Sequence, residues 1–336
     1  MKKLVPIRLP HGHCHPGCPW CVPEQPNSPR VFPDASAIAD RLASKGGLDT
    51  EISLVGVDFG ALSRVEGTAL FDGARAAIRN EWAGGVRLCV SPPYAMRAPR
   101  RLWRLSGVKT VEVLAYSTSD SVLRRHGIKW QASRARSAFE RMVGGGFRTG
   151  AHLLVGAAGS SLKDELAFLE VLAAAGGNFV RLLPYLLLEG REAPQTWEPM
   201  SLEQCVPRCA ELCDRADELG LEIARVGLQP HVDLLDAPAV ISGPDHPSLR
   251  TLVEGARWRG RMQVILRRDA RIGGHLTLRF HPSDEGFVRG YHGRNIPFLR
   301  RRYRLASIEL EPNPDLPRGS LESAWQLPGD PQRKAG

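Results

Sequence analysis

The chain has no apolar run that approaches the roughly 18 residues of a membrane-spanning helix. Hydrophobic residues make up 43% of its 336 residues and charged residues 24%, as is typical of a soluble globular protein. These values exclude an integral membrane protein and a wholly disordered chain. Its basic N-terminus is followed by neither the apolar stretch nor the small-residue cleavage site of a secretion signal. We therefore predict a cytoplasmic protein without a membrane partner.

Lysine is scarce, since it supplies 7 of the 45 basic residues and arginine supplies the other 38. The net charge of +9 is concentrated between residues 256 and 304, where 13 arginines and three acidic residues give +10. Guanidinium groups grip phosphate through paired hydrogen bonds, so this segment favours a polyanionic partner. A preference for arginine throughout the genome is the alternative explanation.

The seven cysteines are an odd number and are too unevenly spaced to indicate a disulfide framework. Cys205, Cys209 and Cys213 recur every four residues, which places them on one face of a helix, where they cannot surround one metal ion. We interpret these three cysteines as core residues, and Cys89 as part of a strand core.

The first three cysteines, Cys14, Cys18 and Cys21, lie within eight residues of one another. Structural zinc sites use four ligands, usually from two knuckles, and the sequence has no second Cys-x-x-Cys. A cubane iron–sulfur cluster takes one cysteine per iron, so three cysteines would leave one iron open.

Short apolar runs alternate with amphipathic segments along the first two thirds of the chain. We predict strands at residues 4–9, 51–57, 86–90, 110–115, 149–155, 179–183 and 222–226, and helices at residues 35–43, 67–82, 133–143, 162–174 and 202–219. Ser201 to Gln204 forms a capping-box pattern, and Ser161 precedes two acidic residues of a first helical turn. This alternation predicts an α/β fold, a partial (βα)6 TIM-type barrel.

The pattern changes after residue 240. We predict strands at residues 261–267, 275–280 and 307–310, a helical turn at residues 286–289 and a helix at residues 294–303. Five prolines and little apolar content follow residue 311. The predicted organisation is a core barrel over residues 1–240, a small basic α+β extension over residues 241–311, and a disordered Pro-rich tail over residues 312–336.

The Cys-x3-Cys-x2-Cys spacing after the first strand of a βα barrel, with Trp20 before the last cysteine, resembles the signature of radical S-adenosylmethionine enzymes. The resemblance implies that Cys14, Cys18 and Cys21 hold a 4Fe-4S cluster whose open iron binds S-adenosylmethionine. It also implies a 5′-deoxyadenosyl radical that abstracts a substrate hydrogen, and an external flavodoxin- or ferredoxin-like electron donor. A zinc site or a redox thiol is the alternative.

Further motifs up to about residue 311 resemble the branch of the catalytic subunit of Elongator and of oxygen-independent coproporphyrinogen oxidase. The chain looks most like the stand-alone bacterial relatives of Elongator that lack its acetyltransferase domain. The motifs are Pro10-His11, Gly56 with Phe59, Val111-Glu112 with Ser117, Val155-Gly156 with Gly159, Arg225-Val226-Gly227-Leu228-Gln229-Pro230 and Gly243-Pro244-Asp245-His246-Pro247. The resemblance implies cofactor contacts from Trp20, from Gly56 through its carbonyl, and from Gly156.

Four positions depart from this pattern. Val57 replaces the second of two glycines, Tyr116 replaces a glutamine, Ile128 stands where an arginine is usual, and Ala158 replaces the proline of a Gly-x-Pro-Gly turn. Several polar cofactor contacts are thereby altered.

Three polar residues lie where replacement contacts could arise, namely Asp58, Ser117 and His152. A core or turn role is the alternative for each of them.

The sequence Gly290-Tyr291-His292-Gly293 resembles the Gly-x-x-Gly loop of a KH module, which clamps the backbone of a single strand. The resemblance implies stacking by Tyr291 and His292. It also implies phosphate contacts from three arginines, namely Arg294, Arg300 and Arg301. The alternative is a packing appendage with a solvated arginine face.

The leading hypothesis is a radical S-adenosylmethionine enzyme that acts on RNA, in particular on a tRNA nucleoside. The second hypothesis is the same chemistry on a small molecule or peptide. The third is a non-catalytic RNA-binding protein with a structural iron–sulfur cluster.

Overall fold

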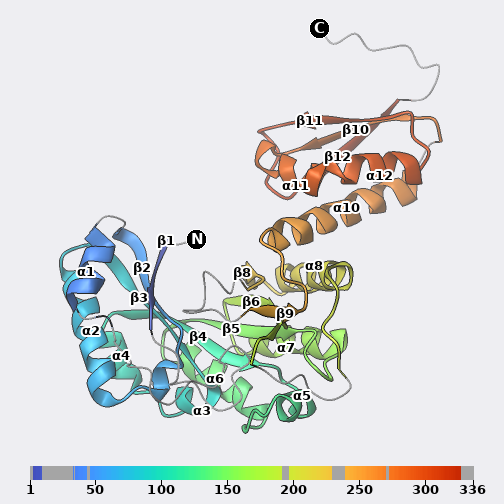
Figure 1. The fold of residues 1–336 in the computed structure, drawn as a ribbon. Coiled ribbons are helices and arrows are strands. Elements are labelled where there is room, and N and C mark those ends of the chain that lie inside the picture. Colours follow the sequence, from blue (N-terminus) through green and yellow to red (C-terminus); the bar gives the residue numbers. More distant parts are fainter. Residues whose placement is uncertain are drawn as a thin grey trace. The chain divides into compact units, whose positions relative to one another are not determined.

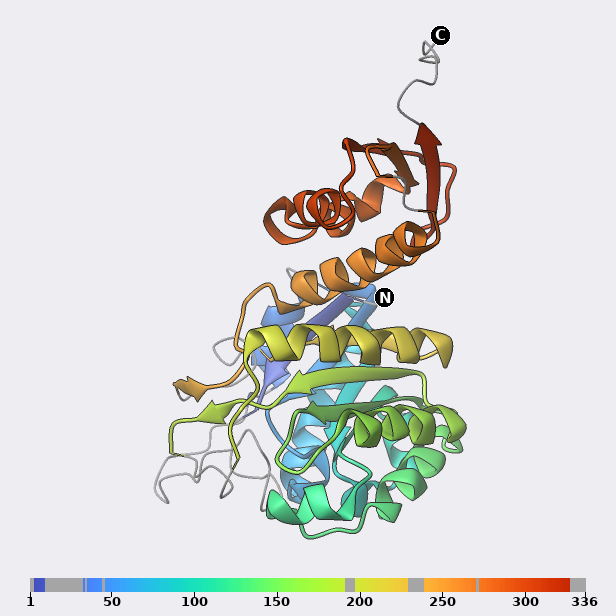
Figure 2. The same ribbon diagram turned by 90° about the vertical axis from the view of Figure 1, so that its right-hand side faces the viewer.

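The structure is a computed structural model that describes residues 3–9, 33, 35–43, 46–190, 197–228, 239–269 and 272–326. The chain divides into two compact units (Figures 1 and 2). Unit 1 comprises residues 1–205 and 212–247, and unit 2 comprises residues 206–211 and 248–336.

Unit 1 is built on a parallel sheet that curls into a half-barrel (Figure 1). Its strands are β1 (Lys3–Arg8), β2 (Gly47–Val55), β3 (Ala83–Val90), β4 (Val108–Tyr116), β5 (Arg148–Val155), β6 (Phe179–Pro184) and β8 (Glu222–Val226). They pair in the order β1-β2-β3-β4-β5-β6-β8, so each strand lies beside its predecessor in this series. Both faces are covered, which explains why β4 is buried at every residue but one, its polar Thr110 and Glu112 included.

The crossovers between these strands are mainly helical. The elements are α1 (Ala35–Ala43), the 3-10 turn η1 (Phe59–Ala61), α2 (Arg64–Arg79), α3 (Pro92–Ala95), α4 (Arg100–Leu105), α5 (Asp120–Arg125), α6 (Ser133–Val143), α7 (Leu162–Ala174) and α8 (Leu202–Glu218). Ser161 and Ser201 both form the predicted capping boxes, with Asp164 and Gln204. A short antiparallel pair, β7 (Leu187–Leu188) and β9 (Val240–Ser242), lies outside the main sheet.

The sequence prediction of unit 1 is confirmed in its main features. Each of the seven predicted strands is part of the parallel sheet, and the α/β partial barrel is present. These elements could be predicted because helix caps and the spacing of apolar residues depend on a few neighbouring residues.

Unit 2 contains a three-stranded sheet with helices on it. Its elements are α10 (Leu249–Asp269), β10 (His275–Phe280), η2 (Pro282–Asp284), α11 (Glu285–Arg289), η3 (Tyr291–Gly293), α12 (Asn295–Arg302), β11 (Ser307–Pro312) and β12 (Leu321–Gln326). Strand β10 is central, parallel to β11 and antiparallel to β12. The hydrophobic core of unit 2 consists of Trp258, Met262, Leu266, Leu276, Leu278, Phe280, Val288, Leu299 and Leu305.

Two predictions for unit 2 are wrong. Residues 261–267 belong to helix α10 and are not a strand. The β-branched pair Val264 and Ile265 favours a strand, but the buried positions Trp258, Met262 and Leu266 recur every four residues, which is the helical period.

The predicted disorder of residues 312–336 is also wrong up to residue 326. Residues 321–326 form β12, whose Leu321 and Trp325 pack against the core of unit 2. These two apolar residues stabilise a strand only because β12 pairs with β10. The composition of the segment alone therefore did not reveal the strand. Residues 327–336 lie outside the described residues.

Within the described ranges, no helix combines the length and the apolar character that crossing a membrane requires.

The helical assignment of α10 predicts unequal effects of two substitutions in one stretch of sequence. Met262 is fully buried and Val264 is 49% exposed. Met262→Ala should lower the free energy of unfolding of unit 2 by about 2–5 kcal/mol, because a buried side chain is lost. Val264→Ala should change it by less than about 1 kcal/mol. Hydrogen exchange of the β10 amides measures both effects. Equal losses would support a strand, in which the two residues share one face.

Candidate functional site

The predicted cluster ligands Cys14, Cys18 and Cys21, together with Trp20, lie outside the described residues. The described part of the candidate site is therefore the end of the sheet at which its parallel strands finish. Gly56 follows β2, Ser91 follows β3, Ser117 follows β4 and Gly156 follows β5, so these four residues share one edge.

Two glycines at this edge are required by backbone geometry. Gly56 has φ +101°, and a Cβ atom there would lie 2.6 Å from the carbonyl oxygen of Leu9. Gly156 has φ +70°, and a Cβ atom there would lie 2.3 Å from Cε of Met200. Any larger residue would be strained at both positions, so the chain can turn away from β2 and β5 only with glycine.

Asp58 is fully buried and works within the fold. Its Oδ1 accepts hydrogen bonds from the backbone N–H of Gly60 at 3.3 Å and of Ser91 at 3.0 Å. Asp58 thus caps η1 and fastens it to the end of β3.

Ser117 is also buried, and its hydroxyl oxygen accepts a hydrogen bond from the N–H of Ser119 at 3.1 Å. The predicted cofactor roles of Asp58 and Ser117 stay predictions, and each residue has a turn-forming role besides.

Ser91 is a residue that sequence reasoning missed. Its side chain is buried, and its Oγ makes no hydrogen bond with any described residue. It also fails to cap α3, which begins directly after it. The only signal in the sequence was a serine directly after a predicted strand.

Below this edge, a buried ion cluster fills the inner face of the half-barrel. Its centre is Glu112 of β4, which is 1% exposed. Glu112 Oε1 accepts from Arg87 Nη1 at 2.7 Å and from Arg181 Nη2 at 2.9 Å. Its Oε2 lies 2.7 Å from Arg181 Nε and 2.6 Å from His152 Nε2. One carboxylate therefore joins strands β3, β4, β5 and β6.

Arg87 extends the cluster to a second carboxylate. Its Nε donates to Glu51 Oε2 of β2 at 3.1 Å, and Thr110 donates to Glu51 Oε1 at 2.8 Å. All three side chains are buried. The cluster thus closes the inner face with two carboxylates, two guanidinium groups and one imidazole.

The electrostatics of the cluster keep Glu112 ionised. Burial opposes its charge, but the positive charge of Arg181, the hydrogen bond from His152 and the charge of Arg87 together hold the pKa of Glu112 well below its usual value.

His152 of the cluster has a buried ring nitrogen that makes no hydrogen bond with a described residue. Because Glu112 is a carboxylate, Nε2 of His152 is the donor in their bond. Its Nδ1 is buried and makes no hydrogen bond with a described residue. In the neutral ring this atom is an acceptor, so His152 can accept a hydrogen bond there.

Cys89, Glu112 and His152 place their ligand atoms within 4.8 Å of one another, which raises the question of a metal site. Both Glu112 oxygens already accept hydrogen bonds, and two guanidinium groups beside them would repel a cation. Burial, and then the charge of Glu112, raise the pKa of the Cys89 thiol well above its usual value, so the thiolate that a metal needs is disfavoured. The three residues are better explained as part of the ion cluster and its apolar cover.

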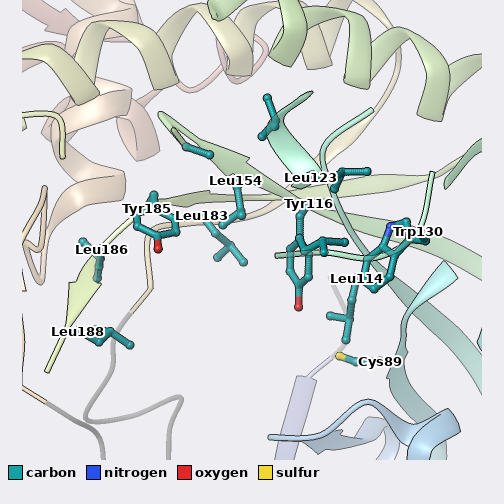
Figure 3. Packing of buried hydrophobic residues seen from close by; sticks show 13 residues of the cluster. Cys89, Leu114, Tyr116, Leu123, Trp130, Leu154, Leu183, Tyr185, Leu186 and Leu188 are labelled. Carbon is teal, nitrogen blue, oxygen red and sulfur yellow. The ribbon is translucent and has the colours of Figure 1, made fainter. Parts of the chain in front are cut away.

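Above the ion cluster, the inner face is apolar and aromatic. Leu114, Tyr116, Leu154 and Leu183 pack in one buried cluster with Tyr185 (Figure 3). Two residues of this cluster depart from the motifs of the resemblance: Tyr116, which has φ +63°, and Ile128, which is 3% exposed. Both departures thus place a buried apolar surface where the resemblance leads us to expect polar groups.

These residues fit a bound S-adenosylmethionine in part. The glycine turns at Gly56 and Gly156 allow close approach of the backbone. The spare polar atoms of Ser91 and His152 are buried donors or acceptors without described partners. The cofactor's methionine end would need such groups.

In unit 2, the predicted loop lies between α11 and α12. Gly290 has φ +72°, and a Cβ atom there would lie 2.6 Å from Cγ of Asn295. Asn295 is buried, and its Nδ2 donates to the carbonyls of Gly255 at 2.8 Å and of Val288 at 3.2 Å. Gly290 is therefore needed for the fold of the loop.

The remaining predicted RNA contacts surround this loop. Tyr291 and His292 have ring centroids 4.1 Å apart, and His292 has φ +51°. His292 and the three arginines Arg294, Arg300 and Arg301 are exposed. The structure thus brings the predicted residues of unit 2 to one loop and the helix that follows it.

Glu112→Gln should destabilise unit 1, because it removes the carboxylate that Arg181 and Arg87 share and leaves Arg87 with Glu51 alone. We expect a loss of about 3–5 kcal/mol in the free energy of unfolding at pH 7, measured with urea. The folded pKa of Glu112 is depressed, so the wild-type contribution is present above the unfolded pKa of about 4.5 and is lost as pH falls through the folded pKa. The difference between the two proteins should shrink accordingly.

The control for this variant is Glu140→Gln, which breaks the exposed pair between Arg136 and Glu140. It should cost less than about 1 kcal/mol. A Glu112→Gln protein as stable as this control would contradict the central role of Glu112.

No protein-family model and no curated protein matches the sequence. Solved structures do match the fold. The archaeal Elp3 of Methanocaldococcus infernus, lacking its first 46 residues, aligns with a TM-score of 0.55 and 14% identity over 78% of this chain. The alignment covers 64% of that Elp3 chain, so this chain spans less than two thirds of its length.

Two other solved structures align at lower TM-scores. The coproporphyrinogen III oxidase HemN of Escherichia coli, described as a radical S-adenosylmethionine enzyme, aligns with a TM-score of 0.46 and 12% identity over 65% of this chain and 53% of its own. SuiB of Streptococcus suis aligns with a TM-score of 0.46 and 8% identity over 69% of this chain and 51% of its own. The curled half-barrel of this chain has the radical S-adenosylmethionine fold.

Proposed function

We propose that the chain is a radical S-adenosylmethionine enzyme that modifies RNA, in particular a tRNA nucleoside. The observation that carries the chemistry is the coincidence of the half-barrel fold with the Cys-x3-Cys-x2-Cys spacing, which begins six residues after β1 ends.

In this proposal, Cys14, Cys18 and Cys21 hold a 4Fe-4S cluster, and the strand ends at Gly56, Ser91 and Gly156 surround S-adenosylmethionine. When bound, these groups supply a radical that removes a hydrogen atom from the substrate. An external flavodoxin- or ferredoxin-like protein supplies the electron.

The residues of the chain orient and shield this chemistry. The apolar inner face around Leu114, Leu154 and Leu183 excludes water, which would otherwise compete for a reactive species. His152 lies beneath it with Nδ1 available to accept a hydrogen bond, and Glu112 fixes the orientation of its ring.

The RNA target is supported by unit 2. Its order β10, α11, Gly-x-x-Gly turn, α12, β11 is the context in which a KH-type loop would work, with two helices meeting at the turn. Exposed arginines follow the turn on α12, and the segment from residue 256 to 304 carries a charge of +10. Glycines allow close approach of a nucleic-acid backbone, and arginines neutralise its phosphates.

A second candidate function is a non-catalytic RNA-binding protein with a structural cluster. It is favoured by one observation, namely that the side chains of Asp58 and His152, expected to replace lost cofactor contacts, already bond within the fold.

Radical initiation separates these two candidates. Anaerobically purified, cluster-reconstituted protein should release 5′-deoxyadenosine when S-adenosylmethionine and dithionite are added, as measured by mass spectrometry. Cys18→Ala should abolish the product, because one cluster ligand is lost. Cys209→Ala, which removes a buried thiol of α8, should retain it. An iron–sulfur absorbance without 5′-deoxyadenosine, even with tRNA present, would favour the non-catalytic candidate.

RNA binding can be tested without disturbing the fold. Gly290 is unsuitable for substitution because of Asn295, whereas His292 and Arg294 are exposed, and Asp tolerates the positive φ of residue 292. His292→Asp with Arg294→Asp should weaken binding of unfractionated tRNA at least about tenfold in fluorescence anisotropy, because negative charge repels the backbone.

The control for the loop variant is Gln263→Glu with Arg267→Glu, which changes the net charge equally near the end of α10. Arg267 is 12 residues beyond Gly255, at which a Cβ atom would lie 3.2 Å from Cα of Gly290, and so is about 18 Å along the helix from it. Equal weakening by both variants would argue against a specific loop contact.

A further inference from the structure

The outer layer of unit 1 contains an open pocket whose polar side chains are all arginines. Its volume is about 630 Å³, and it lies between α4 and the C-terminal end of α6. Its lining includes Arg100, Arg101, Arg104 and Arg141, with Leu102 and Leu105. None of them is acidic, and the ion pairs found among the described residues include none of these four arginines.

Two of the arginines are held in place by backbone carbonyls. Arg141 donates from Nε to Ala95 at 3.1 Å and from Nη2 to Ala98 at 3.3 Å. Arg100 donates from Nη1 to the carbonyl of Arg141 at 3.2 Å, near the negative end of α6. Their guanidinium groups are therefore positioned without losing their charge to a carboxylate.

The other wall of the pocket is also fixed. Trp103 of α4 is 3% exposed and meets the rings of Phe59 and Phe147 edge-on, at centroid distances of 6.0 and 6.3 Å. This anchor leaves Arg101 and Arg104 exposed. The pocket thus presents two ordered and two adaptable guanidinium groups from one rigid platform.

Gly145 is necessary for this arrangement. A Cβ atom there would lie 2.9 Å from Cδ of Arg100 and 3.0 Å from a ring carbon of Phe147. The glycine makes room for the arginine, so the pocket depends on the particular backbone at the end of α6.

We propose that this pocket binds a phosphate group of the RNA backbone, as a second RNA contact separate from the loop of unit 2. The inference rests on the proposed RNA target. A concave set of forked, uncompensated cations suits phosphate, which accepts several charge-assisted hydrogen bonds at once. The two exposed leucines, Leu102 at 51% and Leu105 at 71%, can pack on the sugars beside it.

Such a pocket could also attract an acidic electron-donor protein. The position of the pocket, however, disfavours an electron donor. Two residues separate Leu105 from β4, and two separate Gly145 from β5, so the pocket lies beside the edge where these strands begin. The cofactor site is at the opposite edge, roughly 25 Å away along an eight-residue strand. A folded RNA can contact both edges, whereas an electron donor must come close to the cluster.

The test compares two double variants of the full-length protein for binding of unfractionated tRNA by fluorescence anisotropy at several salt concentrations. Arg101→Gln with Arg104→Gln removes two exposed pocket charges that no described carboxylate pairs with. Arg124→Gln with Lys163→Gln removes two exposed charges of α5 and α7 on the same unit and is the matched control.

We expect the pocket variant to raise the Kd for tRNA about fivefold or more and to reduce the slope of log K against log salt by about one to two, since each phosphate contact contributes to that slope. The control should change the Kd less than about twofold. Inorganic pyrophosphate should compete with tRNA for the wild type and less for the pocket variant.

Three outcomes would overturn the inference. One is an unchanged Kd and salt slope in the pocket variant, and another is an equal change in the control. The third is unchanged tRNA binding with slower cluster reduction by an acidic flavodoxin, which would assign the pocket to a protein. The proposed RNA target fails on a different result, namely no tRNA binding by the wild type. Binding that is lost in the loop variant but kept in the pocket variant overturns only the pocket.

Discussion

The ionised carboxylate of Glu112 is the interaction on which the inner face of the half-barrel depends. A carboxylate that is 1% exposed would be strongly destabilising alone, and it is stable here because Arg87, Arg181 and His152 all bond to it. Without Glu112, Arg181 would lose this carboxylate and Arg87 would keep only Glu51. The pairing of β3 to β6 and the ionisation of this cluster therefore form one cooperative unit.

The same cluster determines what is left for chemistry at the strand ends. His152 is oriented by Glu112, so its Nδ1 is a polar atom that remains for a ligand. Asp58 is engaged by two backbone N–H groups, and the surface above the cluster is apolar. The backbone turns at Gly56 and Gly156 and the hydroxyl of Ser91 consequently carry more of the proposed cofactor site than the charged side chains do.

Arginine serves two different purposes in the two units. In the inner face of unit 1, its charge is cancelled by buried carboxylates and contributes to the fold. In the pocket beside α4 and along α12 of unit 2, arginines remain uncompensated or exposed and are available to a polyanion. A count of arginines cannot separate these purposes, because the difference lies in whether a carboxylate from another strand or helix is within bonding distance.

The sequence by itself determined the alternation of strands and helices in unit 1, the helix caps at Ser161 and Ser201, and the concentration of charge after residue 256. These features are local, since apolar period, capping and composition act over a few residues. Only the tertiary structure decided that Glu112 pairs with Arg181, 69 residues away, that residues 261–267 are helical, and that residues 321–326 complete a sheet. Each of these outcomes depends on a partner distant in the chain. A buried charge, an ambiguous apolar run or an edge strand is stable only when that partner is in place.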